Sequence, residues 1–134
     1  MLTGVRLFRA LRVGSVLLLL SSCGGGVAPP EDGIVCTTNL VAGISIRVFD
    51  APSGNPAACG ARATVTAPGF SEVDQISTTP CADSMPILAV FERPGTYSVV
   101  VSKPGYQDFT ANNVVVTRGV CHVNTISLDV RLSP

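Results

Sequence analysis

The chain has 134 residues, enough for about one domain, and it carries nine basic and nine acidic side chains, so its formal charge is zero. Charged residues make up 13% and hydrophobic residues 46%, and tryptophan is absent. These values exclude a disordered acidic tail, a coiled coil and a polybasic nucleic-acid binder, so no nucleic-acid partner is expected. The zero charge hides a division, because three arginines lie in the first 12 residues and all nine acids lie after residue 30.

The first 22 residues have the pattern of a secretory signal. Arg6, Arg9 and Arg12 precede the apolar run Val13–Leu20, and small residues follow. A membrane-spanning helix needs about 20 apolar residues, so this run of eight is too short to cross a bilayer. A mitochondrial presequence would be basic as well, but it lacks the compact leucine core and the small residues at a cleavage site.

The tetrapeptide Leu20-Ser21-Ser22-Cys23 resembles the bacterial lipobox. The resemblance implies a diacylglyceryl thioether on Cys23, cleavage before it and acylation of the new amino terminus. Two or more acyl chains anchor a protein stably, because each buried methylene contributes about 0.8 kcal/mol. We therefore expect a lipid-anchored protein of the bacterial cell envelope whose partner is membrane lipid, held through Cys23. The alternative is an ordinary signal with an incidental cysteine. Gly24 favours the outer membrane by resemblance to known sorting signals, with the periplasmic or surface face left open.

The chain is expected to divide into three parts. Residues 1–22 form the signal peptide, residues 23–35 the lipidated cysteine with a flexible linker, and residues 36–134 one folded domain. Twelve linker residues follow Cys23. Such a linker spans roughly 20 Å on average and about 40 Å at full stretch. We therefore expect the domain to work close to its membrane.

The folded part shows apolar alternation with a period of two, which predicts strands and no helix. The expected strands are residues 43–50, 61–66, 70–76, 87–92, 97–102, 106–110, 113–117 and 120–132, with a loop at 77–86. Seven or eight short strands separated by proline and glycine turns predict an antiparallel β-sandwich. The last strand changes parity, so we expect a β-bulge near Asn124 and Thr125 that turns both apolar sets inward. A solvent-facing start without a bulge is the alternative.

Four cysteines follow Cys23, and an even set in an exported chain predicts disulfides. Zinc would need closer pairs, whereas the shortest spacing here is 22 residues. Of the three possible pairings we favour Cys36–Cys121 with Cys59–Cys81. The first bond would tie the start of the domain to its last strand, and the second would hold the 77–86 loop against the start of the second strand. The other two pairings stay open.

The segment Arg93–Tyr106, R-P-G-T-Y-S-V-V-V-S-K-P-G-Y, resembles the carboxypeptidase regulatory-like domain, which often carries a G-T-Y-x-V-x-V strand and a P-G-Y turn. Ile44–Val65 resembles the opening hairpin of that family, and Cys121–Val123 resembles a bacterial lipoprotein branch of it. The resemblance covers roughly residues 41–132. It implies a single seven-stranded, prealbumin-like sandwich of the Greek-key type. It implies no catalysis, since such domains are usually accessory parts of enzymes or surface proteins.

The polar residues suggest no catalytic set, so we expect no enzyme, no cofactor and no metal. His122 is the only histidine, and its parity opposite Cys121 predicts a solvent-facing or outer-face position with a structural or surface role. Glu72 and Asp74 share one face of a predicted strand, about 7 Å apart. They could serve glycoside hydrolysis or calcium binding, and a solvated edge-strand face is the favoured interpretation.

We therefore expect a non-enzymatic accessory or protein-interaction lipoprotein of the envelope, with an unidentified envelope protein or glycan as its partner. The alternative is a carbohydrate-binding module of the starch-binding-like sandwich type. Phe49 and Tyr106 are then the best candidates for an exposed aromatic platform, because Tyr97 has core parity. A small hydrolase is a third and weaker possibility, because no G-x-S-x-G nucleophile elbow is present.

Overall fold

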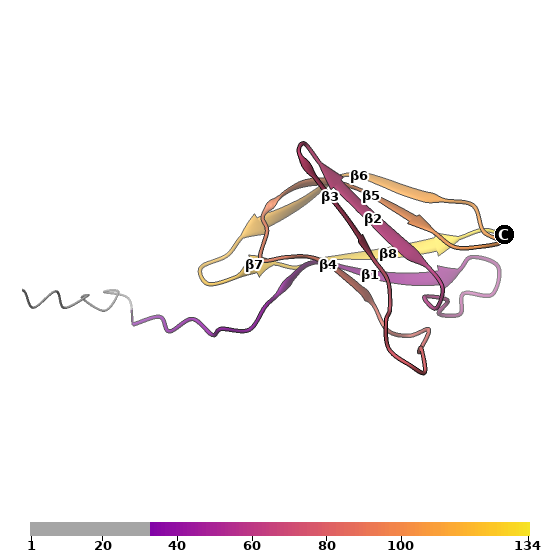
Figure 1. Cartoon of the computed structure of the whole chain (residues 1–134), viewed down its shortest axis with the longest axis horizontal. Coiled ribbons are helices and arrows are strands. Elements are labelled where there is room, and N and C mark those ends of the chain that lie inside the picture. Colours follow the sequence, from indigo (N-terminus) through magenta and orange to yellow (C-terminus); the bar gives the residue numbers. More distant parts are fainter. Residues whose placement is uncertain (1–32) are drawn as a thin grey trace, which may run out of the picture. The chain divides into compact units, whose positions relative to one another are not determined.

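The structure is a computed structural model that describes residues 33–134, and this part of the chain contains β-strands and no helix (Figure 1). The expected signal peptide, Cys23 and all but the last three residues of the expected linker lie outside the described residues. Within residues 33–134 no helix is long and apolar enough to cross a membrane. The strands are β1 (Ala42–Asp50), β2 (Arg62–Ala67), β3 (Phe70–Asp74), β4 (Ile87–Phe91), β5 (Gly95–Ser102), β6 (Phe109–Arg118), β7 (Val123–Asn124) and β8 (Ile126–Leu132).

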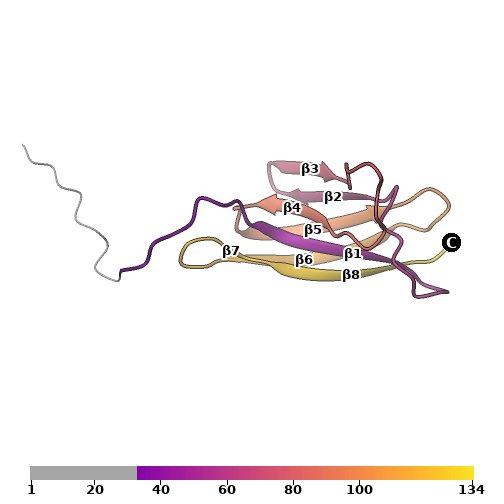
Figure 2. The ribbon, with the colours of Figure 1, turned by 90° about the horizontal axis from the view of Figure 1, so that it is seen from below.

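The strands form two sheets, one with the order β4-β1-β8 and one with the order β3-β2-β5-β6-β7. In Figure 1, β5 and β6 of the five-stranded sheet lie above β1 and β8 of the three-stranded sheet, as expected for a β-sandwich, and Figure 2 looks onto the strands of both sheets from below. The all-β prediction is confirmed for the described residues. Two details are wrong: the resemblance implied seven strands where eight are present, and β1 and β8 run parallel in a sandwich expected to be antiparallel.

The long strand β6 replaces the two strands expected at 106–110 and 113–117. Its register against β5 shifts by one residue between Tyr97 and Val99, and Asn113 has a positive φ of 58°. An extra residue of this kind is a β-bulge, and asparagine tolerates positive φ better than most residues. The segment Ala111-Asn112-Asn113, whose two asparagines suggest a break between strands, is therefore a bulge inside one strand.

The parity change near Thr125 comes from a change of sheet and not from the bulge that we expected. β7 pairs with β6 in the five-stranded sheet, whereas β8 pairs with β1 in the three-stranded sheet. The Thr125 hydroxyl donates to the Ala42 carbonyl at 2.8 Å where the chain crosses between them. Val123 and Val130 are both buried, so the two apolar sets point inward as predicted. The crossing also explains the eighth strand, because the chain pairs briefly before it changes sheet.

The core lies between the sheets and consists almost entirely of aliphatic side chains. β1 contributes Ile44, Ile46 and Val48, and the facing sheet contributes Val65 and Val99, all at most 1% exposed. Each such side chain adds about 1.5–3 kcal/mol when it is fully buried. No polar or charged residue of the described part is fully buried.

Two disulfides connect Cys36 to Cys121 and Cys59 to Cys81, with Cα–Cα distances of 5.3 and 5.9 Å. They are the pairs favoured from the sequence, and they lie at opposite ends of the sandwich. We call the end where the chain enters β1 the near end, on the left in Figure 1, and the opposite end the far end, on the right with the C-terminus. The near end comprises residues 35–41, 91–95 and 118–123, and the far end comprises residues 50–61, 75–86 and 102–108.

Candidate functional site

A hydroxyl, an imidazole and a carboxylate are hydrogen-bonded in a row at the near end. The Thr37 hydroxyl lies 3.0 Å from His122 Nε2, and His122 Nδ1 lies 2.7 Å from Glu92 Oε1. Thr37 precedes β1, Glu92 follows β4 and His122 precedes β7, so three separate connections supply the three groups. We call these three residues the near-end network.

Glu92 is held in place by backbone groups as well as by the imidazole. Its own N–H donates to the Val41 carbonyl at 3.0 Å, and its Oε1 accepts the Val41 N–H at 2.7 Å. The Val41 N–H, followed by the bond to His122, holds the pKa of Glu92 below its usual value. Glu92 also has a positive φ of 52°, and these reciprocal bonds hold it in that conformation.

His122 does not face solvent as predicted. Its side chain is 23% exposed and turned toward Glu92 and Thr37. The cause is a tight turn, because the Gly119 N–H donates to the His122 carbonyl at 2.7 Å and removes the strand alternation on which the prediction rested. Sequence reasoning missed Thr37 and Glu92, which lie 85 and 30 positions from His122. No local signal connects residues so far apart.

The order of groups in the near-end network is that of a hydroxyl–imidazole–carboxylate relay. With a neutral ring, Nδ1–H donates to the Glu92 carboxylate and Nε2 accepts the Thr37 O–H. The same bonds also clamp the segment before β1 onto the domain, next to the Cys36–Cys121 disulfide. The arrangement can therefore hold this segment against the domain. It also places His122 Nε2 where it can accept the proton of the Thr37 hydroxyl.

Glu72 and Asp74 also depart from their predicted setting. They share a face of β3 as expected, but that face is half-buried against β4, while Val73 on the opposite face is 57% exposed. Glu72 Oε1 accepts a hydrogen bond from the Val90 N–H. Val90 has a positive φ of 55°, which breaks the alternation of β4, so that its N–H turns toward β3. The interpretation as a solvated edge face is therefore wrong.

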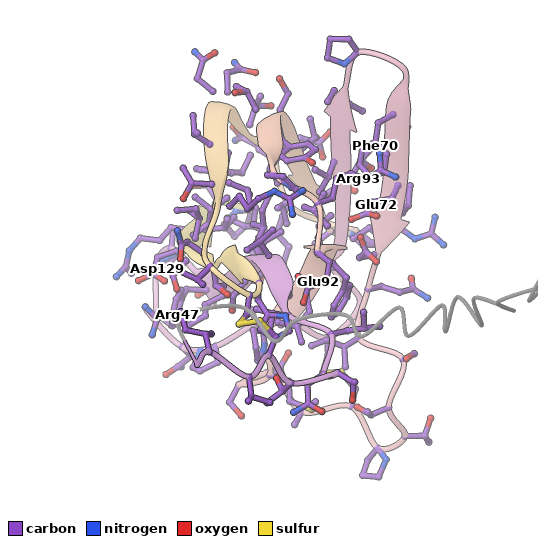
Figure 3. All side chains as sticks on the ribbon, turned by 90° about the vertical axis from the view of Figure 1, so that its left-hand side faces the viewer. Arg47, Phe70, Glu72, Glu92, Arg93 and Asp129 are labelled. Atoms are coloured by element: carbon purple, nitrogen blue, oxygen red, sulfur yellow. A yellow bond between two sulfur atoms is a disulfide. The ribbon has the colours of Figure 1, made fainter. Side chains whose placement is uncertain are left out.

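Asp74 has the strongest electrostatic perturbation among the described carboxyl groups. Burial, followed by the nearby Glu72 charge and a hydrogen bond to Glu72, raises the pKa of Asp74 to about 6. Asp74 Oδ2 is buried and has no hydrogen-bond partner. The Arg93 guanidinium lies 4.5 Å from the Phe70 ring centroid, and Figure 3 shows Glu72 just below these two residues and Glu92 further down. The Glu72–Asp74 pair and Glu92 are two separate carboxylate sites. They are chemically opposite, because Asp74 favours its protonated form and Glu92 favours its charged form.

Phe49 and Tyr106 lie toward the far end but do not form one aromatic platform. Tyr106 packs its ring against the core and donates its hydroxyl to Asp50 Oδ1 at 3.1 Å. Phe49 points to the outer face of the three-stranded sheet, where the Arg131 guanidinium lies 5.5 Å from its ring centroid. Because neighbouring residues of a strand point to opposite faces, Phe49 is separated from the Asp50–Tyr106 pair.

A groove of about 190 Å³ lies beside Phe49. It is lined by Arg47, Val48, Phe49, Pro56, Asp83, Ser84 and Met85. The Cys59–Cys81 disulfide and a 2.7 Å bond from the Cys59 N–H to Asp83 Oδ1 hold the loop that forms one wall. A mostly apolar lining that includes two charged residues, Arg47 and Asp83, suits a short peptide segment or the edge of a sugar.

Residues 33–134 contain no group of three or more histidine, cysteine, aspartate or glutamate side chains placed to hold a metal ion. A comparison of the chain with models of protein families and with curated proteins finds no match. Function must therefore be inferred from the chain itself.

Proposed function

We propose that this protein is a lipid-anchored lipoprotein of the bacterial cell envelope, and that its sandwich is a non-enzymatic protein-interaction module of the carboxypeptidase regulatory-like, prealbumin-like Greek-key type. The observation that carries the proposal is that the entry of the chain and the groove lie toward opposite ends of the domain. The chain enters at the near end, next to Cys36–Cys121, and the groove beside Phe49 lies toward the far end. A tethered module arranged in this way presents its groove away from the point of attachment.

The anchor is supported by the sequence and by the disulfides. Leu20–Cys23 resembles a lipobox, and it follows a basic and then an apolar segment. Two disulfides in a small domain are typical of proteins outside the cytoplasm. An acylated Cys23 would hold the domain at the outer membrane, on its periplasmic or its outer surface.

The family assignment is supported by the physical role of the G-T-Y motif in β5. Tyr97 is buried, and its hydroxyl donates to the Arg93 carbonyl at 3.0 Å. A Cβ at Gly95 would lie 2.9 Å from that hydroxyl, so glycine is required two positions before the tyrosine. The motif thus forms a self-contained corner at the start of a strand, as a family signature would.

The anchor is tested by labelling growing cells with a palmitate analogue. We expect label on the wild-type protein and none on Cys23→Ser, with Cys36→Ser as the matched control that retains it. Label that persists in Cys23→Ser would contradict the lipoprotein assignment.

The groove is tested by placing a photo-crosslinking residue at position 49 or 85 in cells, with position 73 on the outer face of β3 as the control. We expect one protein product, identified by mass spectrometry, at the groove positions only, and its loss on Pro56→Asp. Saturable binding on a glycan array that Phe49→Ala or Tyr106→Ala abolishes would replace this proposal with the carbohydrate-binding alternative. Tyr106→Phe, which removes only the hydroxyl, separates sugar contact from the Asp50 bond.

The near-end network favours hydrolysis of an ester as a second candidate function. Thr37 Oγ1 would attack the carbonyl, its proton would pass through His122 Nε2 to the leaving alcohol, and water would then release the acid. Turnover of p-nitrophenyl acetate that is lost in Thr37→Val and His122→Gln but kept in Thr38→Val would support this function. Equal rates in all four proteins would exclude it.

A further inference from the structure

The most exposed large apolar side chains of the described region gather at the near end. Val35 is 91% exposed, Val120 is 82% exposed and Leu40 is 74% exposed, whereas no other large apolar side chain of residues 33–134 exceeds 57%. Single exposed apolar residues are common on protein surfaces, but a group of three at one end calls for a partner.

These three residues are held together by the bonds of the near end. Val35 and Val120 each adjoin one half of the Cys36–Cys121 disulfide, whose Cα atoms lie 5.3 Å apart. Leu40 adjoins the residue whose N–H binds the carboxylate of the near-end network. The disulfide and the network therefore hold two neighbouring segments together. The segment before β1 exposes Val35 and Leu40, and the turn before β7 exposes Val120. We call Val35, Leu40 and Val120 the apolar rim.

The two ends of the sandwich also differ in charge, and the near end, which carries the apolar rim, is the more basic one. Near the apolar rim, Arg93 and Arg118 outnumber Glu92, which is already bonded to His122. At the far end the three aspartates Asp50, Asp83 and Asp108 outnumber the single basic residue, Lys103. A surface with apolar side chains and a small excess of arginine suits an anionic lipid surface better than the acidic far end does.

The proposed anchor lies close to the apolar rim along the chain. Val35 lies 12 positions after Cys23, so the rim can be at most about 40 Å from the acylated residue. We propose that the apolar rim rests on the bilayer surface, with Val35, Leu40 and Val120 inserted between the lipid headgroups, so that the far-end groove points away from the membrane. This inference rests on the proposed lipid anchor and adds an orientation to it.

Because the chain has no tryptophan, one substitution gives a clean fluorescent probe. Val120→Trp and, as the matched control, Val73→Trp are made in the full-length protein, purified with its acyl chains and reconstituted in vesicles of phosphatidylethanolamine and phosphatidylglycerol with brominated acyl chains. An apolar surface of this kind enters about 5–10 Å into the headgroup boundary, so we expect roughly threefold or stronger quenching at position 120 than at position 73. Adding Leu40→Asp should reduce the quenching at position 120 to the level of the control.

Mass spectrometry of the same samples separates the two proposals. Acylated protein with equal, weak quenching at positions 120 and 73 overturns the membrane contact and leaves the anchor intact. Protein without acyl chains overturns the anchor and with it the contact. Strong quenching at position 120 that Leu40→Asp does not reduce also overturns the contact, because the apolar rim would then not be acting as one surface.

Discussion

The near and far ends of the sandwich use the same device, a disulfide, for different purposes. At the near end Cys36–Cys121 joins a segment that precedes all strands to the turn before β7, and the near-end network reinforces it. At the far end Cys59–Cys81 fixes a loop, and that loop forms the wall of a groove. One end is built to fix where the chain enters, and the other to shape a recessed surface.

The electrostatics of the two carboxylate sites follow the same contrast. Glu92 receives the Val41 N–H and the imidazole, so the charged form is favoured and its pKa is lowered. Asp74 is partly buried and lies near the Glu72 carboxylate, so its pKa is raised. Whether a half-buried acid keeps its charge depends on the number of N–H groups that point at it, more than on its burial alone.

The largest expected effect comes from opening the disulfides one at a time. The Cys36–Cys121 bond spans 85 positions and the Cys59–Cys81 bond spans 22. In the chain-entropy model their loss costs about 4.5 and about 3 kcal/mol of unfolding free energy. Urea unfolding of the Cys36→Ser/Cys121→Ser and Cys59→Ser/Cys81→Ser double variants should therefore show the greater loss for the near-end bond. Equal losses would mean that the near-end segment retains its position without the bond.

The next effect concerns two glycines, Gly43 inside β1 and Gly54 at the far end. A Cβ at Gly43 would lie 2.8 Å from Val116 Cγ1 and 2.9 Å from the Val90 carbonyl, so Gly43→Ala should destabilise the fold by about 2–3 kcal/mol. Gly54 at the far end has open space but a φ of 70°, so Gly54→Ala should cost about 1 kcal/mol through backbone strain alone. Thermal melts of both variants measure the difference, and a smaller loss for Gly43→Ala would show that β4 can move away from β1.

A pH series distinguishes the two carboxylate sites. The folded protein keeps the Asp74 proton up to about pH 6, while the unfolded chain releases it near the ordinary value of 3.8. The contribution of Asp74 to stability is therefore present below pH 4 and is lost as pH rises to 6. Asp74→Asn should remove this decline and raise the unfolding free energy at pH 7 by about 1 kcal/mol, allowing for solvent screening.

Two variants provide the matched controls for this series. Asp108→Asn, at an exposed position of the far end, should leave the decline between pH 4 and 6 unchanged. Glu92→Gln should act in the opposite sense, because Glu92 has a lowered pKa and stabilises the fold above its ordinary pKa of 4.5, losing that contribution as pH falls. If Asp74→Asn leaves the curve unchanged, the pKa of Asp74 in the folded protein is not raised above its ordinary value of 3.8.

The smallest effect is expected on the outer face of the three-stranded sheet. Arg47 and Asp129 form a two-point ion pair, with bonds of 2.7 and 2.9 Å, but their side chains are 56% and 49% exposed. A double-mutant cycle with Arg47→Ala and Asp129→Ala should give a coupling of about 0.5 kcal/mol or less. A coupling several times larger would mean that the pair belongs to the groove beside Phe49 and supports it.

The sequence by itself determined the strands and most of the core. The alternation of Ile44, Ile46 and Val48 predicts a strand with one buried face, because successive side chains of a strand point to opposite sides whatever the strand pairs with. The disulfide pairing was one of three that the sequence allowed. The parity change near Thr125 located the crossing between sheets, although alternation cannot distinguish a bulge from such a crossing.

Only the tertiary structure decided which strands pair and which polar groups meet. β1 and β8 lie side by side although about 80 positions separate them, and Thr37, Glu92 and His122 meet only because three connections close over one end of the sandwich. Asp74 looks like a solvated edge residue until β4 covers its side of β3. Alternation is a property of the local backbone, whereas these contacts depend on how two twisted sheets stack, and no short stretch of sequence carries that information.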